Sequence, residues 1–202
     1  MVRASSGLQA MSAARAVCDG GIPVVEMTMT VPGAVGVIAE LSRAIGDQVL
    51  IGAGTVLDVD AARACVEAGA QFLVSPGFDA KTVQFARERG ILIMPGALTP
   101  TEVITAWKAG ADFVKIFPAG SVGGPSYIKA LKAALPQIPM IPTGGVNLST
   151  AAQFLAAGAA ALGIGGELIS AAAMKEGNYQ IISDSARQYV EIIKAQANQA
   201  RT

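Results

Sequence analysis

The stretch ILIMPGALTPTEVITAWKAGADFVKIF, residues 91–117, contains a complete strand–helix–strand unit. Its two apolar runs, 91–95 and 112–117, have the length of buried strands, and the segment between them, 99–109, has the pattern of an amphipathic helix. Thr99 is a good N-terminal cap for that helix, and Gly110 is a suitable residue to end it. Apolar strands that alternate with helices are typical of a parallel sheet covered on both faces.

The same alternation recurs along the rest of the chain. Further strands are expected at 22–28, 49–53, 71–75, 139–143 and 160–165, and further helices at 6–19, 33–45, 58–68, 79–89, 125–135 and 147–157. Asp58, Asp79 and Asn147 are expected to cap helices, as Thr99 does. With a stub of strand at residues 1–4, these units predict an α/β fold, a (β/α)8 TIM barrel with a shortened first strand. An open doubly wound sheet is the alternative, but no GxGxxG motif follows the first strand.

We expect one domain over residues 1–202, because no linker or low-complexity segment divides the chain. Residues 178–198 have the pattern of a terminal amphipathic helix that packs on the exterior of the barrel. The apolar face of that helix is expected to carry Ile182, Ala186, Val190 and Ile193.

The composition excludes several classes of partner. Hydrophobic residues make up 52% of the chain, and fifteen basic residues balance fifteen acidic ones with no run of like charge. A main partner that is nucleic acid or an anionic membrane is therefore not expected. The first ten residues lack the apolar core of a signal peptide, and no apolar stretch is long enough to span a bilayer. These features predict a soluble, cytoplasmic protein.

The chain contains no histidine. This excludes a Ser–His or Cys–His catalytic dyad and removes the commonest metal ligand among side chains. We therefore expect neither a metal nor another cofactor, and catalysis must come from other side chains or from the backbone.

Lys115 and Glu26 are the charged residues that fall inside the predicted strands, apart from strand-edge residues such as Asp112. Alternation along a strand puts Lys115 on one face with Phe117, and Glu26 on one face with Thr28. If both faces point into the barrel, an amine and a carboxylate meet in a pocket of low dielectric constant. One interpretation is a buried structural ion pair. The other is a lysine whose pKa burial lowers, so that it attacks a carbonyl and forms an imine while Glu26 acts as general acid and base.

Two glycine pairs follow the last two predicted strands. Gly144 and Gly145 in TGGV, and Gly165 and Gly166 in GIGGE, are expected to open the seventh and eighth helices. Backbone N–H groups at such positions bind phosphate in many barrels of this kind. Tight turns are the alternative interpretation, and Glu167 would repel a phosphate unless its side chain turns away.

A series of motifs resembles, in order, the KDPG/KHG aldolase family of class I pyruvate aldolases. The motifs are VVEMTMTVPGA (24–34), IGAGTV (51–56), FLVSPG (72–77), MPGALTPTE (94–102), FVKIFPA (113–119), GPSYIKALKAALP (124–136) and PTGGVN (142–147). The resemblance implies cleavage of 2-keto-3-deoxy-6-phosphogluconate (KDPG) to pyruvate and glyceraldehyde 3-phosphate, an Entner–Doudoroff reaction of carbohydrate metabolism. It also implies a homotrimer.

By the same resemblance, Lys115 is the Schiff-base lysine and Glu26 the proton shuttle. Thr55 and Arg3 would hold the pyruvate carboxylate, Pro76 and Phe117 would form apolar walls, and Gly144, Gly145, Gly165 and Gly166 would bind the phosphate. Cleavage of 4-hydroxy-2-oxoglutarate or of the galactonate epimer is an alternative within this chemistry. A phosphosugar isomerase or epimerase, with Glu26 as base and Lys115 as its electrostatic partner, is a more distant one.

Overall fold

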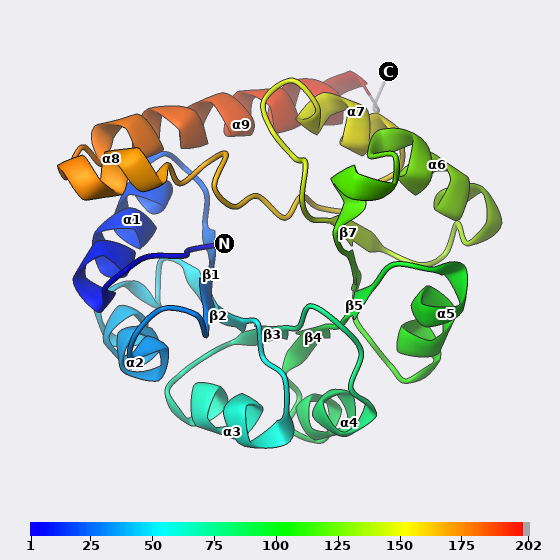
Figure 1. Ribbon diagram of the computed structural model, residues 1–202, viewed down its shortest axis with the longest axis horizontal. Coiled ribbons are helices and arrows are strands. Elements are labelled where there is room, and N and C mark those ends of the chain that lie inside the picture. The colour runs from blue at the N-terminus through cyan, green and yellow to red at the C-terminus, as the bar shows by residue number, and fades with distance from the viewer. Residues whose placement is uncertain (200–202) are drawn as a thin grey trace.

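The computed structural model describes residues 1–199, in which parallel strands lie at the centre and helices surround them (Figure 1). The strands are β1 (Val24–Thr28), β2 (Leu50–Gly54), β3 (Phe72–Val74), β4 (Leu92–Met94), β5 (Gly96–Ala97), β6 (Val114–Ile116) and β7 (Met140–Pro142). The helices are α1 (Gly7–Asp19), α2 (Ala34–Ile45), α3 (Val59–Glu67), α4 (Ala80–Glu88), α5 (Pro100–Lys108), α6 (Pro125–Ala134), α7 (Ala151–Ala156), α8 (Ala171–Glu176) and α9 (Gln180–Gln199), with a 3-10 helix η1 (Ala119–Val122). This is the TIM-barrel arrangement that the alternation predicts, and no helix among these residues is both long and apolar enough to cross a membrane.

The strands form two parallel sheets, one of β1–β2–β3–β4 and one of β5–β6–β7. The break between them falls at Pro95, which has no backbone N–H to donate to a neighbouring strand. The predicted strand 91–95 is therefore interrupted at its last residue and resumes as β5. Single hydrogen bonds cross this break, from Asp112 N to the carbonyl O of Ile93 at 3.1 Å and from Lys115 N to the carbonyl O of Pro95 at 3.0 Å.

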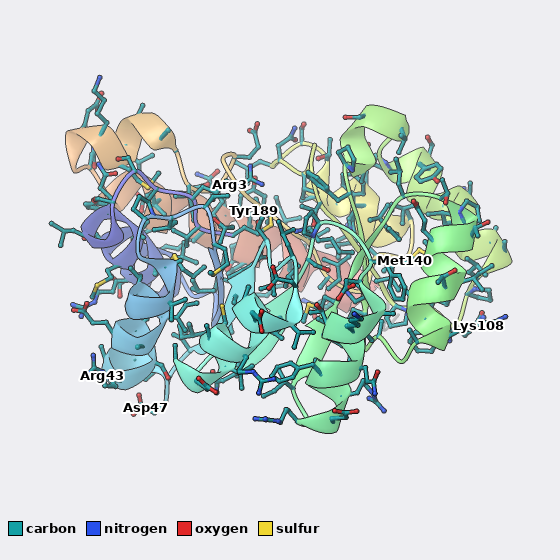
Figure 2. All side chains as sticks on the ribbon, turned by 60° about the horizontal axis from the view of Figure 1, so that its bottom comes forward. Arg3, Arg43, Asp47, Lys108, Met140 and Tyr189 are labelled. Carbon is teal, nitrogen blue, oxygen red and sulfur yellow. The ribbon has the colours of Figure 1, made fainter. Side chains whose placement is uncertain are left out.

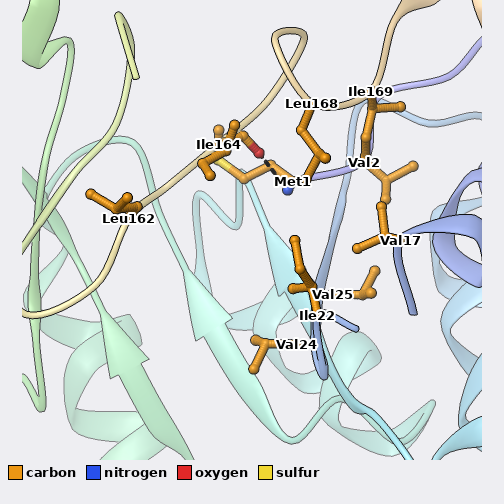
Figure 3. A pocket seen from close by; sticks show the side chains of 10 residues that line it. All are labelled: Met1, Val2, Val17, Ile22, Val24, Val25, Leu162, Ile164, Leu168 and Ile169. Carbon is orange, nitrogen blue, oxygen red and sulfur yellow. Dashed lines mark hydrogen bonds between the residues drawn. The ribbon is translucent and has the colours of Figure 1, made fainter. Parts of the chain in front are cut away.

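The opposite side of the barrel is also joined by single hydrogen bonds rather than by a strand ladder. The predicted strand 160–165 is reduced to an isolated bridge between Thr143 and Gly163, and the expected first strand to a bridge between Val2 and Met27. The segment 163–166 contains three glycines, which give it little side-chain packing to hold it as a strand. The Met1 amine donates to the carbonyl O of Ile164 at 2.8 Å, beside an apolar cavity (Figure 3).

The helix starts follow the predicted caps at Asp58, Asp79 and Thr99, whose side chains all accept a backbone N–H of the first turn. Asn147 is the exception. Its side-chain oxygen accepts the N–H groups of Ser149 and Thr150 at 2.9 and 3.0 Å, which stabilises a turn before the helix. The sequence predicted that the seventh helix begins at residue 147. In the structure it begins at Ala151.

The terminal helix α9 packs against α1 and α7 (Figure 1). Ile182 and Ala186 are fully buried, whereas Val190 is half-buried and Ile193 is exposed, so the expected apolar face was wrong at its far end. Tyr189 is completely buried instead, and Figure 2 shows it away from peripheral charged side chains such as Arg43.

Glycines in the strands leave the space that the large inward side chains occupy. A Cβ added to Gly52 would lie 2.2 Å from the ring of Phe72, and one added to Gly54 would lie 1.9 Å from Oε1 of Glu26. Both distances are far below van der Waals contact, and Phe72 and Glu26 are held in neighbouring strands. The position of the Glu26 side chain therefore depends on the missing side chain at Gly54.

We predict that Gly54→Ala lowers the free energy of unfolding by about 1–3 kcal/mol, because Glu26 must move from a packed interior position. Gly36→Ala is the matched control, since it lies within α2 and a Cβ there meets nothing within 4 Å. That control should gain about 0.5–1 kcal/mol from the lower flexibility of alanine in a helix. Urea unfolding of both variants measures the difference, and equal stabilities would contradict the assignment.

Candidate active site

Lys115 and Glu26 meet inside the barrel, as the alternation along their strands predicts. Lys115 is the middle residue of β6 and Glu26 that of β1, and their Nζ and Oε1 atoms are 4.0 Å apart. The two side chains are only 7% and 12% exposed. Oε1 of Glu26 is buried and has no hydrogen-bond partner within residues 1–199. A carboxylate oxygen without a partner beside an amine leaves an acceptor available to a third molecule.

Burial lowers the pKa of the Lys115 ammonium, because desolvation disfavours its charged form. The carboxylate of Glu26 acts in the opposite direction, and the positive charge of Arg3 lowers the pKa further. Nζ of Lys115 also lies 5.5 Å from the centre of the Phe117 ring and 3.8 Å from the sulfur of Met1. The surroundings of the amine are thus largely apolar, which favours its neutral and nucleophilic form.

Thr55 follows β2 directly and has a left-handed backbone, with φ of 61°. It is the one non-glycine residue with positive φ among residues 1–199. Such a conformation costs of order 1–3 kcal/mol in a residue other than glycine and is concentrated at functional sites. Because Thr55 follows the last residue of β2, it lies at the end of the barrel where the carboxyl ends of the other strands lie.

The other predicted wall and carboxylate-binding residues also lie at this end. Pro76 follows β3 and is half-buried, Phe117 follows β6, and Arg3 follows the bridge residue Val2 and is exposed. Pro76 also lines a shallow pocket beside the ends of β2 and β3, formed by Val56, Leu57, Ser75, Pro76, Gly77, Phe78 and Asp79. Arg3 is close enough to act on the pKa of Lys115.

The two glycine pairs also occupy this end, but they do not open helices. α7 begins at Ala151 and α8 at Ala171, in both cases well after the glycines, so that expectation was wrong. Gly165 instead begins a single turn, in which its carbonyl accepts the N–H groups of Leu168 and Ile169. Gly144 and Gly145 both have positive φ, and a Cβ on Gly145 would lie 2.8 Å from the Cα of Gly120.

Several backbone N–H groups around these glycines are free to bind an anion. Within residues 1–199, the N–H groups of Gly145, Gly165 and Gly166 donate to no protein acceptor. Glu167, which would repel an anion if it pointed inward, is exposed. The glycine segments therefore offer N–H donors that do not belong to a helix terminus, and the neighbouring Glu167 is an exposed residue.

Three buried hydroxyl groups at the ends of strands were not assigned a role from the sequence. Thr28 ends β1, Ser75 follows β3, and Thr143 follows β7, and all are at most 5% exposed. In the sequence, each of these residues comes at the end of an apolar run. A hydroxyl residue at such a position is also common in turns, so the pattern alone does not identify a site residue. No group of three or more His, Cys, Asp or Glu side chains in the described part of the chain is arranged to hold a metal ion.

Comparison with known proteins identifies the family. A sequence model described as KDPG and KHG aldolase matches residues 2–185. The 2-dehydro-3-deoxy-6-phosphogalactonate aldolase of Escherichia coli K12 is 38% identical over 188 residues, 93% of this chain and 88% of that protein. The KHG/KDPG aldolase of the same strain is 34% identical over 183 residues, 90% of this chain and 85% of that protein.

A solved structure supports the same grouping. It is the KDPG aldolase of Legionella pneumophila with pyruvate captured as a covalent carbinolamine intermediate, and it is 30% identical in sequence. The superposition has a TM-score of 0.86 and covers 93% of this chain and 90% of the other. The family model and these relatives cover most of the sequence, and this chain therefore belongs to the KDPG and KHG aldolase family.

Proposed function

We propose that this aldolase cleaves 2-keto-3-deoxy-6-phosphogluconate to pyruvate and glyceraldehyde 3-phosphate through an imine on Lys115. The observation that carries the proposal is the buried amine of Lys115, 4.0 Å from a carboxylate oxygen that has no hydrogen-bond partner within residues 1–199. A neutral amine attacks the C2 carbonyl of the substrate, and loss of water gives the imine. The imine then accepts the electron pair that is released when the C3–C4 bond breaks.

Glu26 moves the protons in this scheme. As the C3–C4 bond breaks, the C4 hydroxyl gives its proton to Glu26, directly or through one water, and becomes the aldehyde. The enamine that remains on Lys115 takes a proton at C3, and hydrolysis of the resulting imine releases pyruvate and the free amine. The orphaned Oε1 of Glu26 supports this role, because its lone pairs are not engaged by the protein within residues 1–199.

The remaining predicted residues would bind the substrate around this pair. Arg3 and Thr55 are proposed to hold the carboxylate next to the keto group, and Pro76 and Phe117 to form apolar walls. The glycine segments, residues 144–145 and 165–166, are proposed to bind the phosphate through backbone N–H groups. The free N–H groups of this region and the exposed position of Glu167 support that assignment.

A second candidate substrate is the galactonate epimer. It is favoured by the higher identity to the galactonate aldolase, 38% against 34% for the KHG/KDPG aldolase. The two substrates differ in configuration at C4, so assay of both separates the candidates. A phosphosugar isomerase would use Glu26 as base but would form no covalent bond to Lys115.

A homotrimer, a cytoplasmic location and a place in the Entner–Doudoroff route complete the proposal. The family resemblance supports the trimer, and light scattering should give a mass of three 20.4 kDa chains.

Replacement of Lys115 tests the nucleophile. Lys115→Met should fold, because an apolar side chain suits this buried position. It should lose both turnover and the mass increment that pyruvate and borohydride leave on the wild-type enzyme. Because burial lowers the pKa of Lys115, wild-type trapping should proceed at pH values well below 10.5, where an ordinary lysine is protonated. The exposed Lys129→Met variant is the control and should keep both properties. Trapping in Lys115→Met would refute the assignment.

Replacement of Glu26 tests the proton shuttle. Glu26→Gln keeps the shape of the side chain but cannot exchange protons, so kcat should fall by about 10²–10⁴. Imine trapping by pyruvate should persist, although more slowly. Steady-state kinetics and mass spectrometry measure the two effects separately, and a kcat near the wild-type value would mean that another group moves the proton.

The phosphate preference tests the glycine segments. We expect kcat/KM to be at least about tenfold higher for the phosphorylated substrate than for 4-hydroxy-2-oxoglutarate. Because Glu167 is exposed, Glu167→Ser should change that ratio by less than about threefold. Equal efficiency on both substrates in the wild type, with a preference only in the serine variant, would show that Glu167 acts on the phosphate site.

A further inference from the structure

The segment that follows β7 contains two successive peptide units whose carbonyl groups are held and whose N–H groups are free. The carbonyl O of Gly144 accepts the N–H of Gly120 at 2.9 Å. The carbonyl O of Gly145 accepts the Thr150 hydroxyl, also at 2.9 Å. The N–H groups of the same two units, those of Gly145 and Val146, donate to no protein acceptor in the described part of the chain. Val146 is a buried residue, and unpaired N–H groups of buried residues are rare, so its N–H indicates a partner from outside the chain.

The planar trans peptide fixes where these N–H groups point. The carbonyl and the N–H of one peptide unit lie in one plane and point in opposite directions. Because Gly120 holds the carbonyl of Gly144, the N–H of Gly145 is directed away from the segment that follows β6. The bridge between Thr143 and Gly163 lies on the other side of this strand. The N–H of Gly145 therefore faces the side of the barrel on which the second glycine segment lies.

Thr150 orients the second peptide unit in the same way. A threonine hydroxyl has one proton to donate and lone pairs that accept. Its Oγ1 accepts the N–H of Asn147 at 2.9 Å, and the carbonyl O of Gly145 is the nearest acceptor for its own proton. The side-chain oxygen of Asn147 is farther from Oγ1, at 3.3 Å, and already accepts hydrogen bonds from Ser149 and from the Thr150 N–H. The Thr150 proton therefore goes to Gly145, and the N–H of Val146 is directed away from Thr150.

We infer that Thr150 is a positioning residue of the proposed phosphate site, and that the N–H of Val146 is a further phosphate donor beside that of Gly145. The inference rests on the proposed aldolase function, which assigns phosphate to the glycine segments but gives no role to Thr150 or Val146. Successive backbone N–H groups in turns form concave anion sites. A glycine restricts the adjoining peptide little, so the Thr150 hydroxyl supplies the restraint. An orientation that is fixed before the substrate arrives costs no ordering on binding.

The inference is tested by condensation of pyruvate with two aldehydes that differ only in the phosphate, glyceraldehyde 3-phosphate and glyceraldehyde. Thr150→Val keeps the branched shape of threonine without its hydroxyl. It should lower kcat/KM for the phosphorylated aldehyde by about three- to tenfold, the usual effect of one hydrogen bond, and change kcat/KM for glyceraldehyde by less than about twofold. The matched variant Thr150→Ser keeps the hydroxyl and should stay within about twofold of the wild type on both aldehydes. Thr150→Ala also lacks the hydroxyl, and it should repeat the loss even if the valine variant does not fold.

Borohydride trapping with pyruvate separates failure of this inference from failure of the proposed function. Pyruvate carries no phosphate, so every Thr150 variant should trap it as the wild type does. If the wild type neither traps pyruvate nor condenses it with either aldehyde, the aldolase proposal fails and this inference fails with it. If the wild type prefers the phosphorylated aldehyde and Thr150→Val keeps that preference, the aldolase stands and the role of Thr150 is refuted. Equal losses on both aldehydes in Thr150→Val, or loss of the preference in Thr150→Ser, would refute that role as well.

Discussion

The buried approach of an amine to a carboxylate is the constraint on which this structure depends. At 4.0 Å and an effective dielectric constant of 20, the attraction between Lys115 and Glu26 would be worth about 4 kcal/mol if both were charged. Removing two ions from water costs several kcal/mol for each of them. Attraction alone therefore does not offset desolvation, and the lowered pKa of Lys115 follows from this imbalance. The same imbalance makes the pair a poor source of stability and favours a reactive amine.

Glycines in the neighbouring strands allow close packing around the pair. Gly54 leaves room for the Glu26 carboxylate. Gly96, which is in register with Lys115, lets β5 lie close to the backbone that follows β3, because a Cβ on Gly96 would lie 2.1 Å from the carbonyl O of Pro76. Glycine in a strand normally weakens it. Here the two sheets are short and partly joined by single hydrogen bonds. The glycines weaken the strands further, and they leave space around the reacting groups.

Most of the fold could be predicted because its signals are local. Apolar runs and capping residues such as Asp58 and Asp79 act within a few residues of their own positions. The errors arose where a local signal competed with another local preference. Pro95 cannot donate a hydrogen bond in mid-strand, and the Asn147 side chain stabilises a turn instead of a helix start. The glycine-rich segment 163–166 has an apolar pattern but too few side chains to be held as a strand.

The candidate site was predictable to the extent that it follows from alternation. The meeting of Lys115 and Glu26 required only that two strands of a barrel turn the same face inward. The contacts of the buried hydroxyl groups required more, because Oγ1 of Thr28 donates to the carbonyl O of Val2, which is 26 residues from Thr28 in sequence. No pattern within a single strand contains that contact. It emerges only when the chain places the stub of its first strand beside β1.

Imine chemistry requires a neutral amine and hydrogen-bond partners for the substrate, and these are found in different parts of the barrel. At the N-terminal ends of the strands, the first residues of β1, β2 and β4 are the apolar but exposed Val24, Leu50 and Leu92. At the C-terminal ends are hydroxyl groups and free backbone N–H groups, among them those of Thr28 and Gly145. Between these ends, Nζ of Lys115 lies beside the Phe117 ring and the Met1 sulfur, which favour its neutral form, while the C-terminal ends offer hydrogen-bond partners to the oxygen-rich part of a substrate. A group that solvates the ammonium, placed beside Phe117, would raise the pKa of Lys115, and an apolar end for the substrate would leave its oxygens without partners. The reactivity of the lysine therefore requires apolar surroundings, whereas binding of the substrate requires polar ones. Because the strands are parallel, the polar groups at their C-terminal ends lie together at one end of the barrel.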